Sequence, residues 1–197
     1  MRTGLNPESN HEEDYSKVTL GFWTYLMTDC VLFASLFATY LVLHNNTNGG
    51  PDSSTLFSLP YVLLETFLLL TSSFTSGLAL LATHQNKPRQ IVQWLAVTAV
   101  LGMGFLVMEL TEFAKLAHEG HSWAQSGFMS SYFTLVGTHG LHIGIGLLWL
   151  LALVVMVLKQ GATHANVRRL TLFNLFWHFL DIVWIFIFSA VYLLGAL

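Results

Sequence analysis

An apolar stretch near the C-terminus carries a histidine and an aspartate three residues apart. The stretch is Leu172–Tyr192 (LFNLFWHFLDIVWIFIFSAVY), and the pair is His178 and Asp181. Positions i and i+3 lie on the same face of a helix. A charged side chain at the centre of a bilayer costs roughly 2.5–3.5 kcal/mol on insertion scales. We therefore expect this pair to face protein, buried water or a lipid head group.

The other apolar segments carry ionisable side chains as well: Asp29, Glu65, Glu109, Glu112, His139 and His142. Glu109 and Glu112 repeat the spacing of three residues, and so do His139 and His142. Asp29 has no salt-bridge partner near it in the sequence. These groups allow three chemical interpretations.

The first interpretation is a metal or haem site. Histidine is the usual haem ligand, and His139 or His142 opposite His178 would supply two imidazoles. Three intramembrane histidines are too few for two bis-histidine haems, however. The Glu-x-x-His motifs of carboxylate-bridged di-iron bundles are absent.

The second interpretation is a proton path, because chains of Asp, Glu and His within membranes serve as proton relays. Asp29 is the best candidate for such a role. The third interpretation is structural: the polar groups tie helices together through hydrogen bonds or contact lipid head groups. Each interhelical hydrogen bond of this kind contributes on the order of 0.6 kcal/mol.

The composition limits the class of protein. The chain has 197 residues, of which 54% are hydrophobic and 10% charged, and its mean hydropathy is +0.59. Soluble domains are about 25% charged, so this composition predicts an integral membrane protein. The net charge of −3 gives no reason to expect nucleic-acid binding, and the single cysteine, Cys30, excludes an internal disulfide.

The elements that must position these groups are membrane-spanning helices. A span needs about 20 predominantly apolar residues. Five segments qualify, and the sequence therefore predicts an all-α bundle with helices at about 20–43, 61–83, 91–113, 128–158 and 170–196. Residues 1–19 form a polar tail, and residues 20–197 form one membrane domain.

Charge asymmetry predicts the orientation of the bundle. With the N-terminus inside, the cytoplasmic side holds Arg2, Lys17, Lys87, Arg89, Lys159, Arg168 and Arg169. Only Lys115 lies outside. Cytoplasmic loops carry an excess of Lys and Arg, so we expect a cytoplasmic N-terminus and an external C-terminus.

Several motifs resemble subunit III of the haem–copper terminal oxidases. They are GFWTYLMTDCVLFASLFATY, TNGGP, GTHGLHIGIG and WHFLDIVWIF, in that order, between about Gly21 and Gly195. The phrases YLMTDC and LLETFLLL are most similar to the cytochrome bo-type ubiquinol oxidase branch. Five helices are typical of the bacterial members, since the mitochondrial members have seven.

The resemblance implies roles for individual residues. Asp29 stands where the family commonly has a carbodiimide-reactive intramembrane glutamate, and Glu112 stands where the family has a carboxylate near the outer end of its helix. His139, His142, His178 and Asp181 match family residues that tie helices or contact lipid. Glu65 matches less clearly.

The resemblance also implies a function. Subunit III is a non-redox core subunit: the haems and copper lie on subunit I, which this chain would contact directly, with subunits II and IV elsewhere in the complex. We expect a bacterial inner-membrane ubiquinol oxidase subunit that stabilises subunit I, holds phospholipid and supports proton uptake, without catalysis or a metal of its own. The alternatives are subunit III of a cytochrome c oxidase, an autonomous proton-coupled transporter and an electron-carrying haem protein.

Overall fold

The computed structural model describes residues 7–44, 46, 59–85, 87–118 and 126–194, and this part of the chain is helical with short turns and without strands. The long helices are α1 (Pro7–Leu43), α3 (Leu59–His84), α4 (Pro88–His118), α5 (Gly127–Gln160) and α6 (His164–Ile187). A π-helical segment, η1 (Phe188–Leu193), continues α6. Five of these stretches are long and apolar enough to cross a membrane, which confirms the predicted fold class.

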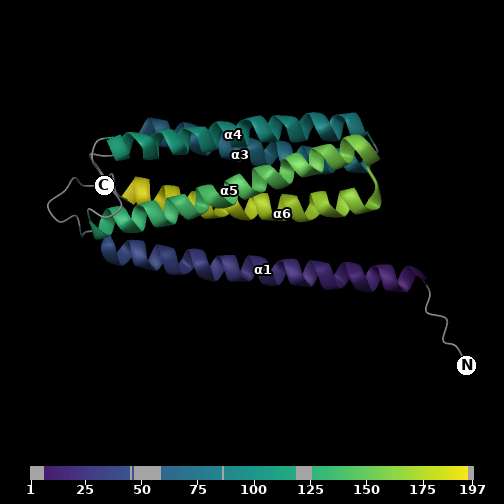
Figure 1. Cartoon of the computed structure of the whole chain (residues 1–197), viewed down its shortest axis with the longest axis horizontal. Helices are drawn as coiled ribbons and strands as arrows, with labels where there is room; N and C mark the ends of the chain where they lie inside the picture. The colour runs from purple at the N-terminus through teal and green to yellow at the C-terminus, as the bar shows by residue number, and fades with distance from the viewer. Residues whose placement is uncertain (1–6, 45, 47–58, 86, 119–125, 195–197) are drawn as a thin grey trace, which may run out of the picture.

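The helices run along one common direction and alternate in sense (Figure 1). α1 lies along one edge of the bundle, α3 and α4 form the opposite edge, and α5 and α6 lie between them. α1 packs against α5 and α6, whereas α3 packs chiefly against α4 and α6. The Pro7 end of α1 and the Leu193 end of η1 consequently lie at opposite ends of the bundle.

Two glycines allow the aromatic core to form between α4, α5 and α6. A Cβ atom on Gly146 would lie 2.7 Å from Cζ3 of Trp177, and one on Gly102 would lie 3.0 Å from Cζ2 of the same ring. Trp177 is fully buried. The absence of a side chain at both positions therefore lets this indole from α6 occupy the space between α4 and α5.

The helices begin earlier than the hydrophobic segments that predicted them. α6 begins at His164 instead of residue 170, because Thr163 accepts a hydrogen bond from the backbone N–H of Asn166 and caps the helix. Gly161, at φ 72°, ends α5 and starts this tight turn. α1 begins at Pro7, so the expected polar tail contributes residues 7–19 to the first helix. Residues 195 and 196, expected at the end of the last helix, lie outside the described residues.

The outer surface of the bundle is apolar. Large side chains on every long helix are exposed there, for example Leu20, Val31, Phe74, Val100 and Leu148. Side chains of this kind suit contact with lipid or with other membrane helices.

Candidate functional site

His178 and Asp181 lie on α6 at the centre of the polar contacts between α6 and α3. Nδ1 of His178 lies 3.8 Å from Oδ2 of Asp181, and the same nitrogen makes a short hydrogen bond with Oγ of Ser73. Asp181 is buried, but the His178 side chain is 48% exposed. His178 is close to the middle of the span His164–Leu193, so a polar ring meets the surface of the bundle at mid-membrane depth.

Three further hydrogen bonds extend this seam along α3 and α6. Ser76 donates to Oδ1 of Asn174. The indole N–H groups of Trp177 and Trp184 donate to Ser72 (3.1 Å) and Thr66 (3.0 Å). Because bilayer lipid offers no partners for these groups, the two helices satisfy each other's polar side chains.

Asp29 on α1 lies opposite His142 on α5. The distance from Asp29 Oδ2 to His142 Nε2 is 3.7 Å, and the other ring nitrogen of His142 contacts the Thr138 carbonyl at 2.7 Å. The ring of Phe33, one helical turn after Asp29, packs 5.3 Å from the imidazole. Asp29 is 6% exposed. The pair is thus a carboxyl and an imidazole enclosed between two helices.

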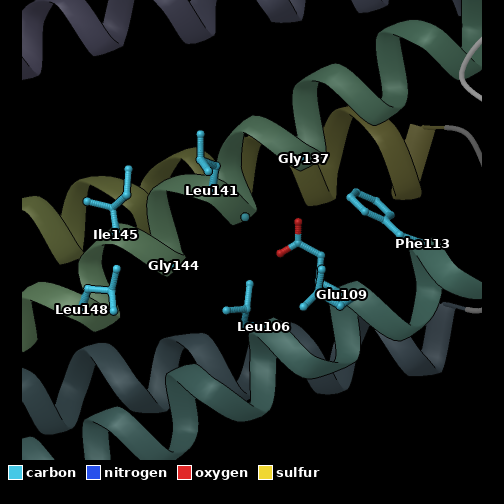
Figure 2. Close-up of a pocket in the computed structure, with 10 residues that line it drawn as sticks. Leu106, Glu109, Phe113, Gly137, Leu141, Gly144, Ile145 and Leu148 are labelled. Carbon is cyan, nitrogen blue, oxygen red and sulfur yellow. The ribbon is translucent and has the colours of Figure 1, made fainter. Parts of the chain in front are cut away.

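Glu65 on α3 and Glu109 and Glu112 on α4 lie close enough to interact electrostatically with one another. Glu112 accepts a hydrogen bond from Tyr192 Oη at 3.2 Å, and Tyr192 contacts Tyr132 Oη at 3.1 Å. Both carboxyl oxygens of Glu65 and of Glu109 are buried without a hydrogen-bond partner in the described structure. Glu109 points into a groove between α4 and α5 (Figure 2).

His139 is fully buried among aromatic rings. Its imidazole lies 5.3 Å from the Trp184 ring and 5.9 Å from Phe105, with Phe33 at 6.4 Å. Neither ring nitrogen has a hydrogen-bond partner among the described residues. His139 therefore contacts aromatic rings, whereas His178 makes a hydrogen bond with Ser73 on α3.

Comparison with known proteins identifies the family of the chain. Residues 8–196 match the family described as cytochrome c oxidase subunit III. The chain belongs to this family. It is 52% identical to a cytochrome bo(3) ubiquinol oxidase subunit 3 of Pseudomonas aeruginosa, over 96% of this chain and 93% of the relative.

Other relatives in the subunit III family carry different names. The chain is 46% identical to a cytochrome c oxidase subunit 3 of Bacillus sp. PS3, over 96% of this chain and 91% of the relative. It is 43% identical to a quinol oxidase subunit 3 of Bacillus spizizenii, over 99% of this chain and 98% of the relative. The role of a haem–copper oxidase subunit III follows from the family and these names.

A metal site on this subunit III chain finds no support in the described residues. No group of three or more His, Cys, Asp or Glu side chains is placed there to hold a metal ion. Cys30 is exposed on α1, where it lines a groove that α1 shares with α6. His118 is the last residue of α4, and residues 119–125 lie outside the described residues.

Sequence reasoning missed the hydroxyl groups that complete these sites. Ser72, Ser73 and Ser76 supply the α3 side of the seam with α6, and Tyr132 and Tyr192 connect to Glu112. One signal was present: the run TSSFTS places several hydroxyl side chains within an otherwise apolar segment. Such a run indicates a helix face that meets another polar face.

Proposed function

We propose that this chain is a non-redox core subunit of a proton-pumping terminal quinol oxidase in a bacterial plasma membrane. In this proposal subunit I carries the haems and copper, oxidises ubiquinol and reduces O₂ to water. The observation that supports it best is the 52% identity, across 93% of its length, with a relative named as a ubiquinol oxidase subunit 3.

A second candidate is subunit III of a cytochrome c oxidase. The 46% identical relative from Bacillus sp. PS3, which carries that name, supports this candidate. The electron donor distinguishes the two. A cytochrome c oxidase has a copper-binding cysteine pair in its subunit II, and a quinol oxidase lacks it.

In the complex, this chain contacts subunit I directly, steadies it during turnover and holds phospholipid, with subunits II and IV as further members. The broad apolar outer faces support such contacts. The N-terminus lies in the cytoplasm, and the C-terminus lies outside. The seven-to-one distribution of Lys and Arg supports this orientation.

Asp29 supports proton uptake in this proposal. The Asp29 carboxyl lies beside the His142 imidazole, and both groups can accept and release protons. Glu65, Glu109, Glu112, His139, His142, His178 and Asp181 tie helices or contact lipid in this proposal.

The test is a purification of the tagged chain in mild detergent, followed by a reduced-minus-oxidised spectrum. We expect haem bands that disappear when the chain is stripped from its larger partner, together with ubiquinol oxidation that drives oxygen consumption. Haem retained by the isolated chain would contradict the non-redox role. Transport activity by the chain reconstituted alone, with no haem in either sample, would establish the transporter instead.

A further inference from the structure

The groove between α4 and α5 has a volume of about 440 Å³ and opens on the outer surface of the bundle. Its walls are apolar: Leu106 and Phe113 belong to α4, and Leu141, Ile145 and Leu148 belong to α5 (Figure 2). The three α5 side chains are 51–69% exposed. The groove is therefore accessible from the side of the chain that no other described helix covers.

Glycines form the α5 side of the groove, at Gly137, Gly140 and Gly144. A Cβ atom on Gly140 would lie 2.5 Å from Oε1 of Glu109, so only glycine admits this carboxyl between the helices. A Cβ atom on Gly144 would meet no atom within 4 Å. The space beside Gly144 is thus open to a second backbone, because small residues allow helices to approach closely.

Glu109 is the polar group of the groove. It is 2% exposed, and neither carboxyl oxygen has a hydrogen-bond partner in the described structure. Buried polar atoms nearly always have hydrogen-bond partners, and each exception in a native structure calls for an explanation. A carboxyl oxygen accepts hydrogen bonds in either protonation state, so the expected partner is a hydrogen-bond donor.

The depth of Glu109 in the membrane favours a transmembrane helix over a phospholipid head group as the occupant of the groove. Glu109 is six residues from the midpoint of α4 (Pro88–His118), which is about 9 Å along the axis. Gly140, which faces the carboxyl, is closer still to the midpoint of α5. The hydrocarbon core extends about 15 Å from its centre. The carboxyl therefore lies well below the ester and head groups of a phospholipid, but at a depth that side chains of a transmembrane helix occupy.

We propose that the α4–α5 groove binds a transmembrane helix of another oxidase subunit, which donates a hydrogen bond from a hydroxyl or amide side chain to Glu109. This inference rests on the proposed function, since it requires a multisubunit complex. The partner helix packs its backbone beside Gly144 and covers the exposed leucines of α5. A serine, threonine, asparagine or glutamine on that helix would suit the site.

The test compares matched glycine variants in the purified complex. Gly144→Leu fills the groove, and the control Gly77→Leu adds the same side chain to α3, where a Cβ also meets no atom within 4 Å. We expect Gly144→Leu to lower the amount of one co-purifying subunit by at least about fivefold and the control to leave it unchanged. Glu109→Leu should act like Gly144→Leu, whereas Glu109→Gln keeps an acceptor oxygen and should retain the subunit. Equal retention in all four variants would overturn the proposal, and so would equal loss in both glycine variants.

A second measurement does not depend on the folding of these variants. A photo-crosslinking amino acid at Leu141 of the otherwise wild-type chain should form an adduct with a different subunit of the purified complex. An adduct with phospholipid, or with a second copy of this chain, would overturn the proposal. Wild-type chain that purifies without any haem-bearing partner would instead contradict the proposed function, so the two failures are distinguishable.

Discussion

Oδ2 of Asp29 lies 3.7 Å from Nε2 of His142, so α1 and α5 bury a carboxyl and an imidazole against each other. The two residues are far apart in the sequence, and the antiparallel arrangement of α1 and α5 brings them to the same level (Figure 1). Phe33 covers the imidazole from the α1 side.

Asp29→Asn should shorten the active lifetime of the oxidase. Asparagine keeps the size of the side chain but removes its titratable proton, so a proton-handling role would be lost while packing remains. We expect normal assembly and a loss of oxygen consumption during turnover that is about twofold faster or more. The neighbouring exposed thiol offers a control in Cys30→Ser. A decay rate equal to that of the wild type would show that Asp29 only packs.

The double variant His178→Ala, Asp181→Ala should reduce the amount of assembled complex. It removes the contacts with Ser73 at the middle of the α3–α6 seam, and each interhelical hydrogen bond is worth on the order of 0.6 kcal/mol. We expect a drop of about half or more in haem recovered with the tagged chain. Ile182→Ala, an exposed position on the same helix, is the control. Normal haem recovery in the double variant would argue against a structural role for the pair.

Gly146→Ala should destabilise the bundle by about 1–3 kcal/mol, because its Cβ would overlap the Trp177 ring at 2.7 Å. Thermal inactivation of the purified complex measures the effect. Gly77→Ala, which meets nothing within 4 Å, should leave the inactivation temperature unchanged. If Gly146→Ala also left it unchanged, the close packing of Trp177 would not limit stability.

Tyr192→Phe should also destabilise the bundle, by about 1–3 kcal/mol, because it removes the Tyr192 hydroxyl that donates a hydrogen bond to the half-buried Glu112. Glu112→Leu, which removes the acceptor oxygens, provides the second arm of a double-mutant cycle. We expect the two changes to be non-additive, since the residues share one hydrogen bond. Strict additivity in thermal inactivation would show that the contact contributes nothing measurable.

The sequence predicted the existence and type of the five spans because each contains an apolar run of the required length. It missed the first turns of α6, where polar residues follow the Thr163 cap. It also predicted a shared face for His178 and Asp181, which local helix geometry determines. The contacts of His178 with Ser73 and of Asp29 with His142 depend on how each helix is rotated about its axis. Rotation depends on packing between distant segments, which one sequence does not reveal.

The π-helical segment η1 determines the direction in which the side chains of the last helical turns point around the helix axis. Its wider turn accommodates one more residue than an α-helical turn, so every side chain that follows is displaced by about 100° around the axis relative to a continuous α-helix. Val191 and Tyr192, which lie in this π-helical segment, are buried in the core. Loss of a single residue that precedes Tyr192 in this segment would therefore keep the helix but rotate Tyr192 away from Glu112.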